Sequence, residues 1–226
     1  MSRATIPTMS LSIGLALGLL ASAVPAQTPS TTKIPLTREQ VVAEIKSPDL
    51  ELRRRAAAWL GELGVMGDAP LLLEALGDDD EAVRLLAENS VWQVWSRSGD
   101  PDADSLLQVG IDQMNNGDGA AAVETFSKVI QKKPDFAEAW NKRATVYFLM
   151  GENEKSLKDC DEVIKRNPAH FGALAGYGQI YLRLDQPERA LAYFRRALRI
   201  NPNLTGVQQV IPELEQLLTQ RRKGTI

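Results

Sequence analysis

The 226-residue chain contains a single cysteine, Cys160, and a single histidine, His170. One cysteine excludes an intramolecular disulfide framework, so stability must come from packing. No second histidine or cysteine stands at metal-ligand spacing from His170, so no metal-binding residues are predicted. We interpret His170, which follows Pro168 closely, as a solvated turn residue, and Cys160 as a small buried hydrophobe.

The chain also lacks an excess of charge of one sign, because its net charge is only −3. This argues against a nucleic-acid partner, which would favour a strongly basic face, and no nucleic-acid partner is expected. There is no phosphate-binding glycine loop, no Gly-x-Ser-x-Gly elbow and no plausible Cys–His pair. The acidic run 78–81 is explained as the start of a helix. We predict no catalytic residue, no cofactor, no small-molecule substrate, and hence no enzyme.

Residues 1–26 have the composition of a secretory signal peptide. Arg3 is their only charge, 9–20 is apolar, and small residues end the segment at Ala26. Export to the periplasm or out of the cell is expected after cleavage, and residues 27–36 are expected to form a flexible linker. An uncleaved signal anchor is the alternative. Membrane association is expected only in that case or through a partner.

Three prolines in the second half, Pro134, Pro168 and Pro202, follow one another at a constant period of 34. The same helix–turn–helix pattern recurs around each of them. This is the period at which a helix pair stacks on an identical pair. Because stacked pairs present a long groove rather than an enclosed pocket, the pattern predicts a binding scaffold.

Residues 37–99 contain a second repeat. Thr37 and Gln40 predict a capping box, and Ser47 with Pro48 at the first helical position predicts the start of the next helix. A pattern of acidic, aliphatic, arginine and small residues occurs twice with a period of 31: Asp49, Leu52, Arg53, Ala56 and Leu60, then Asp80, Val83, Arg84, Ala87 and Val91. Over about 48–98 the chain resembles HEAT-like repeats of the phycobilisome-lyase type, a name that implies no lyase activity here.

A boundary at 99–101 precedes the longer repeats. Residues 103–204 resemble three units of the tetratricopeptide repeat family (103–136, 137–170 and 171–204) within a region predicted to span 100–204. Three sets of residues carry the resemblance: small residues where helices approach closest, large residues between units, and glycines at turns. They are Gly110, Ala144 and Gly178; Trp140, Tyr181 and Phe194; and Gly117 and Gly151. Positive φ is expected at the two turn glycines.

Some positions depart from the family pattern. Gln113 stands where an apolar residue is expected, which suits a unit beside a different repeat type. Arg143 must reach solvent or find a partner, because an unpaired buried guanidinium is costly. Trp92 and Trp95 lie one turn apart, and at least one of them is expected to fill the junction between the two repeat regions. Residues 205–226 are predicted to form a capping helix and tail.

The resemblance implies an all-α fold, a right-handed α-solenoid whose concave groove holds a segment of a protein partner. The groove residues that it assigns are mostly apolar, with two side-chain amides: Leu107, Ile111, Met114, Asn141, Thr145, Phe148, Gln179, Leu182 and Arg183. Family members that clamp a chaperone's carboxylate use Lys, Arg and Asn on successive first helices. Leu107, Ile111 and Ala175 stand at such positions, so no anion clamp is expected.

We therefore expect a non-enzymatic, exported scaffold or adaptor with a protein partner. Two alternatives stay open at this point. One is an accessory factor of envelope assembly or of a membrane complex, acting on an outer-membrane or polymer client. The other is an accessory subunit of an enzyme. A further alternative concerns the groove, which the chain's own C-terminal helix could fill.

Overall fold

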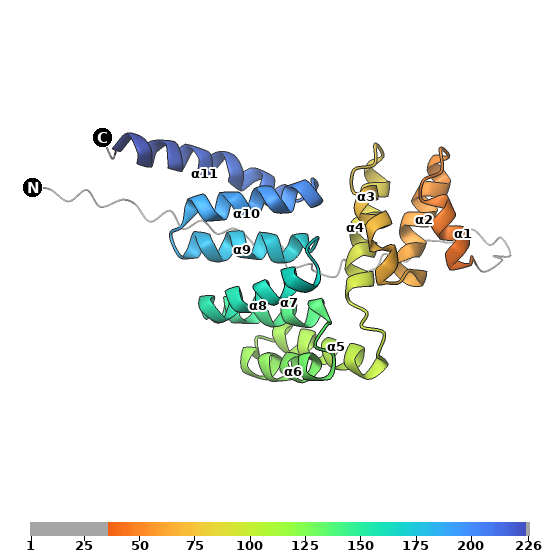
Figure 1. Ribbon diagram of the computed structural model, residues 1–226, viewed down its shortest axis with the longest axis horizontal. Helices are drawn as coiled ribbons and strands as arrows, with labels where there is room; N and C mark the ends of the chain where they lie inside the picture. Colours follow the sequence, from red (N-terminus) through yellow and green to blue (C-terminus); the bar gives the residue numbers. More distant parts are fainter. Residues whose placement is uncertain (1–35, 225–226) are drawn as a thin grey trace, which may run out of the picture. The chain divides into compact units, whose positions relative to one another are not determined.

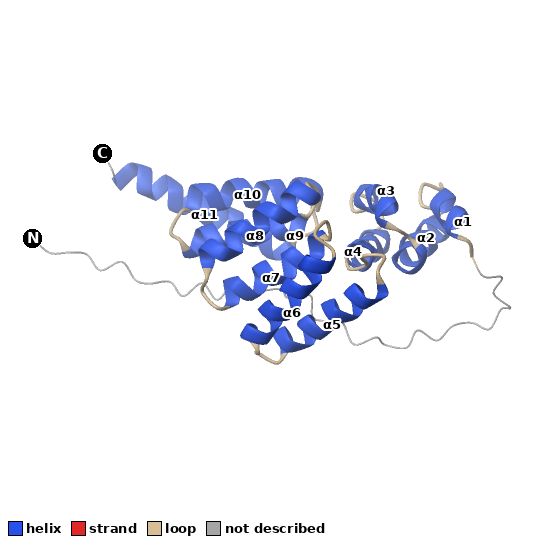
Figure 2. Ribbon diagram, turned by 60° about the horizontal axis from the view of Figure 1, so that its bottom comes forward, coloured by secondary structure: helices blue, strands red, loops and turns tan. Residues whose placement is uncertain are grey.

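The computed structural model describes residues 36–224, and within this range it contains helices and connecting loops but no strand (Figure 2). The N-terminal helices are α1 (Arg38–Glu44), α2 (Leu50–Leu63), a 3₁₀ turn (Met66–Asp68), α3 (Ala69–Ala75) and α4 (Glu81–Trp95). They are followed by α5 (Pro101–Asn115), α6 (Gly119–Lys132), α7 (Ala137–Leu149), α8 (Asn153–Arg166), α9 (Phe171–Arg183), α10 (Pro187–Ile200) and α11 (Thr205–Gly224) (Figure 1).

The predicted signal peptide (1–26) and almost all of the predicted linker (27–36) lie outside the described residues. Within 36–224, no helix combines the length and the apolar character that a membrane span requires.

The N-terminal helices show why the shorter pattern repeats. Asp49 caps α2 and Asp80 caps α4, each by accepting backbone N–H groups of the first turn. Arg53 donates to the carbonyl oxygens of the two residues before Asp49, at 3.1 and 3.3 Å. Arg84 donates to the two carbonyl oxygens before Asp80, at 2.9 and 3.0 Å. Both occurrences of the pattern therefore close the loop that leads into a helix in the same way.

The expected helix starts in this region are confirmed in one case and wrong in another. Thr37 and Gln40 form the predicted capping box of α1. The second helix does not begin at Pro48, because Asp49 is the N-cap and the helix starts at Leu50. The Asp49 carboxylate accepts two N–H groups, from Glu51 and Leu52, whereas the hydroxyl of Ser47 accepts only that of Asp49.

The period of 34 holds in the helices of the second half from α6 onward, whereas α5 begins 36 residues before α7. The first helices α7, α9 and α11 begin at Ala137, Phe171 and Thr205, each one full period after the one before. Each repeat proline stands just beyond the end of a second helix, α6, α8 or α10. Positive φ at Gly117 and Gly151, 80° in both, confirms the predicted tight turns.

Close approach between helices explains the small residues. A Cβ atom on Gly110 would lie 2.5 Å from the ring of Phe126, and one on Gly178 would lie 2.4 Å from Phe194. Arg143 finds the partner that its position requires, since it donates two hydrogen bonds to Asp159, at 2.7 and 2.8 Å. The stack is therefore held together by both apolar contact and a partly buried ion pair.

The C-terminal helix α11 occupies the position of a fourth first helix. It packs mainly on α10 through Val207, Val210, Leu214 and Leu218, all buried. Pro212 lies within this helix. Because its buried stripe faces the second helix of the preceding unit, α11 closes the end of the stack and does not fill the groove.

Candidate partner-binding groove

The groove-facing residues divide into two sets along the helices α5, α7 and α9. Leu107 and Asn141 are 2% and 9% exposed, and Leu107 lies in the core beside Phe126, so neither offers surface to a partner. The others lie in the C-terminal halves of the three helices and form what we call the open half. They are Ile111, Met114, Thr145, Phe148, Gln179 and Leu182, which are partly exposed, and Arg183, which is exposed.

The N-terminal ends of α7 and α9 carry a buried polar cluster that we call the covered half, formed by Glu138, Asn141, Lys142, His170 and Gly172. Glu138 Oε2 lies 2.9 Å from His170 Nε2 and accepts a hydrogen bond from Asn141 Nδ2 at 3.1 Å. Lys142 Nζ lies 3.1 Å from Glu138 Oε1. The two groups form an ion pair, but their geometry does not make a hydrogen bond. Glu138 Oε1 therefore accepts no hydrogen bond from the described residues.

The carboxyl group of Glu138 stays ionised within this cluster. Burial alone raises its pKa, but the charge of Lys142 and the hydrogen bond with His170 act in the opposite direction. The net result is a pKa below the usual value of a glutamate. The cluster therefore joins α7 to α9 by a buried charge that its neighbours compensate.

His170 is fully buried, so its interpretation as a solvated turn residue was wrong. Its Nδ1 atom accepts the N–H of Ala173 and caps α9, which leaves Nε2 to donate to Glu138. A signal for burial was present in the sequence. Phe136 and Leu204, which stand one repeat period before and after His170, are apolar.

Two tryptophans of α4 cover this cluster. The Trp95 ring stacks on His170 with centroids 4.5 Å apart, and Trp92 meets Phe171 edge-on at 5.1 Å. A Cβ atom on Gly172 would lie 2.4 Å from Trp92, so only glycine leaves room for that ring. The tryptophans do fill a junction, as expected, but its other side is formed by His170 at the end of the second unit and by Phe171 and Gly172 of the third, rather than by the first unit.

A second link ties the N-terminal helices to the end of the third unit. Asn203 Nδ2 donates to the carbonyl oxygen of Leu76 at 2.8 Å. Ile200 and Leu204 pack against the same apolar core as Trp95. Helices α1–α4 thus contact the repeats at the start of α9 and at the connection from α10 to α11, and they cover only one half of the groove.

The open half presents an aromatic ring beside a cation. The Arg183 guanidinium lies 3.6 Å from the centroid of the Phe148 ring, and it also donates to the Phe148 carbonyl oxygen. This is close enough for a cation–π interaction. Arg183 forms no ion pair with any described residue. Phe148 and Arg183 together join the last turns of α7 and α9.

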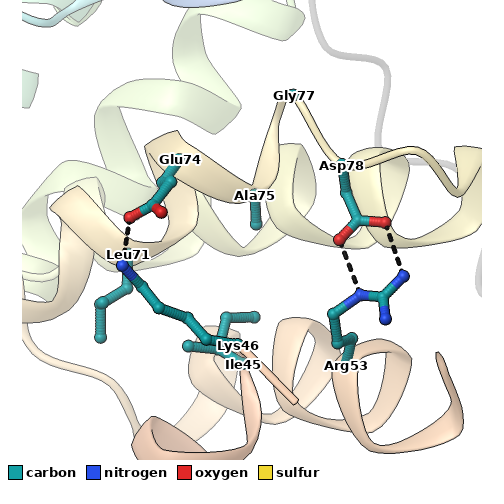
Figure 3. A pocket seen from close by; sticks show the side chains of 8 residues that line it. All are labelled: Ile45, Lys46, Arg53, Leu71, Glu74, Ala75, Gly77 and Asp78. Atoms are coloured by element: carbon teal, nitrogen blue, oxygen red, sulfur yellow. Dashed lines mark hydrogen bonds and ion pairs between the residues drawn. The ribbon is translucent and has the colours of Figure 1, made fainter. Parts of the chain in front are cut away.

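A hollow between α1–α2 and the α3–α4 connection, about 320 Å³ in volume, is not a comparable site. Figure 3 shows that its charged residues pair with one another: Lys46 with Glu74, and Arg53 with Asp78 through two hydrogen bonds. These charges therefore stabilise the packing of the N-terminal helices. Within residues 36–224, no group of three His, Cys, Asp or Glu side chains is placed to hold a metal ion.

Stacked helix pairs with a period of 34 define a helical-repeat protein of the α-solenoid class. A family profile described as tetratricopeptide repeat matches residues 135–203. A TPR repeat-containing protein of Rhizobium etli is 32% identical over 145 residues, which cover 64% of this chain and 70% of that protein. The chain belongs to the tetratricopeptide repeat family.

Other similarities are more limited in extent. Anaphase-promoting complex subunit 7 of Dictyostelium discoideum is 32% identical over 98 residues, which cover 43% of this chain but only 17% of that protein. Among solved structures, the first TPR of Spaghetti (RPAP3), bound to the HSP90 peptide SRMEEVD, aligns with a TM-score of 0.50 at 21% identity. That alignment covers 52% of this chain and 93% of the other, and it shows a shared fold.

Proposed function

We propose that this chain is a non-enzymatic scaffold that holds a segment of a partner protein in the open half of its groove. The observation that carries the proposal is the pair of partly exposed apolar residues Phe148 and Leu182 beside the exposed Arg183. They lie on neighbouring first helices, α7 and α9, where α4 does not cover them. Membership of a family built from binding repeats supports this assignment.

The chemistry of the open half favours an extended, mainly apolar segment. Ile111, Met114 and Leu182 provide apolar contact, while Gln179 offers an amide that can bond to the backbone of a bound chain. Arg183 supplies the one charge of this set, and its guanidinium can meet an acidic group of the partner. Aromatic and arginine side chains are common where binding energy is concentrated.

The acidic peptide seen in the RPAP3 neighbour does not suit this groove. An anion clamp needs free cations on successive first helices, and Lys142 already pairs with the buried Glu138. Leu107 and Ala175 bring no charge at the corresponding places. The shared fold therefore supports the binding of a segment, whereas the partner's chemistry follows from this chain's own residues.

Export is part of the proposal and rests on the composition of residues 1–26. We place the scaffold in the periplasm or outside the cell, with the signal removed at or near Ala26. N-terminal sequencing of the protein from the exported fraction tests this. A sequence starting near residue 27 is expected, and one starting at residue 1 or 2 would contradict cleavage.

The groove assignment is tested with a display library of random 12-residue peptides, selected on the purified protein. Peptides selected on the wild type should bind Phe148→Ala and Leu182→Ala at least about ten-fold more weakly, as expected for apolar anchors. Val109→Ala is the matched control, because Val109 is 47% exposed on α5 and lies outside the groove residues.

Selected peptides that bind the two groove variants as tightly as the wild type would contradict the assignment. Equal weakening by Val109→Ala would contradict it as well, since the effect would then not be specific to the groove. Melting curves of all three variants provide the check that each still folds.

A further inference from the structure

A second hollow, which unlike the first is apolar, lies where the turn between α5 and α6 meets the end of α7. Its volume is about 310 Å³. The residues that line it carry apolar side chains or none: Met114, Gly117, Gly119, Ala120, Val146, Leu149 and Met150. Met114 also belongs to the open half of the groove, so the hollow continues the groove over its edge.

Local sequence explains why the space is not filled. Gly117 has a φ of 80°, and no atom lies within 4 Å of the position that its Cβ would take. A Cβ on Gly119 would lie 3.1 Å from the sulfur of Met150, so this glycine leaves the floor of the hollow clear. The walls remain in water, because Leu149 and Met150 are 49% and 48% exposed.

The same place one repeat later is built differently. Asn153 and Glu154 stand one full period after Gly119 and Ala120, and thus put polar side chains where the first unit has a hydrogen and a methyl group. The hollow is therefore a property of the junction between the first and second units. Two large apolar side chains left half exposed beside it are typical of a contact surface.

The charge at the rim indicates which partner fits. Asp118 lies between two lining residues, and its carboxylate accepts only the N–H of Ala121, as the N-cap of α6. Acidic residues at the next two turns are compensated, Glu152 by Lys155 and Asp185 by Arg221. Asp118 forms no ion pair with any described residue. A positive group of a partner would supply the missing charge.

We propose that this hollow receives an aliphatic or methionine side chain of a partner protein segment, with a lysine or arginine next to it that pairs with Asp118. The proposal rests on the proposed function, because the segment reaches the hollow from the open half of the groove. Met114 and Met150 suit such an anchor, since flexible thioether side chains adapt to different apolar shapes. A small molecule is a poorer fit, because no polar side chain within the hollow would orient it.

The test uses synthetic 12-residue peptides on the purified protein. In the series, a central Leu, Met or Ser is flanked by Lys or by Glu, and binding is measured by fluorescence anisotropy. Leu and Met peptides with Lys flanks should bind at least about ten-fold more tightly than the Ser peptide, as for a buried apolar anchor. Replacing the flanking Lys residues by Glu should weaken binding, and the loss of affinity should be larger at low salt than at high salt.

Filling the hollow provides the decisive variant. Gly119→Leu and, from the exposed rim, Ala120→Leu should weaken the Leu–Lys peptide about ten-fold. Gly206→Leu is the matched control, because it lies in the first turn of α11 with no atom within 4 Å of its Cβ position. Asp118→Asn keeps a good N-cap but removes the charge, and Asp49→Asn makes the same change far from the hollow.

A second readout does not depend on any variant. On addition of the Leu–Lys peptide, the methyl NMR signals of Met114 and Met150 should shift, while that of Met66 in the N-terminal region should not. If none of these peptides shifts the first two signals, or if Gly119→Leu and Ala120→Leu both bind like the wild type, the proposal is overturned. If Phe148→Ala weakens binding but Gly119→Leu and Ala120→Leu do not, the proposal for the hollow is overturned while the proposed function stands.

Discussion

The two halves of the groove share the helices α7 and α9 yet differ in nearly every physical respect. The covered half contains a buried glutamate, a buried histidine and a glycine under a tryptophan ring. The open half contains apolar side chains in partial contact with water and the exposed Arg183. Contacts within the chain bury the covered half, whereas the open half has exposed surface that can bind a partner.

This difference shows that repeat position alone does not determine function. Glu138 and Gly172 occupy the same place in their units, yet Gly172 leaves room for Trp92, whereas Glu138 bonds to His170, on which Trp95 stacks. Phe148 and Leu182 also occupy one shared place, further along the same two helices. The N-terminal helices therefore decide how much of the repeat groove a partner can reach.

The largest expected effect of breaking the covered half comes from Trp95→Ala. Trp95 is 2% exposed and stacks on His170, so its removal leaves a cavity between α4 and α9. The free energy of unfolding should fall by about 3–5 kcal/mol, measured by urea denaturation. Trp92→Ala should cost less, because Trp92 is only partly buried. A loss below about 1 kcal/mol for Trp95→Ala would mean that α4 does not hold this position.

Glu138→Gln should have an intermediate effect. The substitution keeps the shape but removes the charge that compensates Lys142, which should cost about 1–3 kcal/mol at pH 7. The matched change Glu124→Gln, in an exposed pair with Lys128, should cost less than about 1 kcal/mol. Equal costs for the two substitutions would contradict the burial of the Glu138 cluster.

The pH dependence of stability sharpens the same point. The folded-state pKa of Glu138 lies below its unfolded value. The stabilisation from its charge is therefore fully present above the unfolded pKa, near 4.5, and is lost as pH falls through the folded pKa. Urea midpoints should drop as the pH falls below about 5, and those of Glu138→Gln should drop less. If the urea midpoint of the variant falls as steeply with decreasing pH as that of the wild type, other carboxylates cause the loss of stability in acid.

The smallest expected effect on stability belongs to the open half. Phe148→Ala removes a partly exposed ring and its contact with Arg183, worth about 0.5–1 kcal/mol. Peptide binding should nevertheless fall about ten-fold. Thermal melting and anisotropy on the same sample separate the two quantities. A large loss of stability with no loss of binding would reverse the roles assigned to the two halves.

Much of the repeat architecture could be predicted from the sequence because its causes are local. Proline spacing, small residues at close approaches and turn glycines each act within one unit or between neighbours. The start of α2 was misplaced because Ser47-Pro48 and Asp49 both offer caps, and only the contacts decide between them.

The packing of α4 against the start of α9 could not be predicted in the same way. Trp95 and His170 lie in different repeat regions, far apart in the sequence, and no periodicity joins them. Those long-range contacts of α4 are what separate the two halves of the groove.

Hydrogen exchange of the whole protein, with and without a peptide that it binds, tests the central claim most directly. Protection should increase in the last turns of α7 and α9, around 145–149 and 179–183, and stay unchanged in α4. Faster exchange in α4 together with protection at 137–141 and 171–175 would show that the partner displaces the tryptophans and takes the covered half instead.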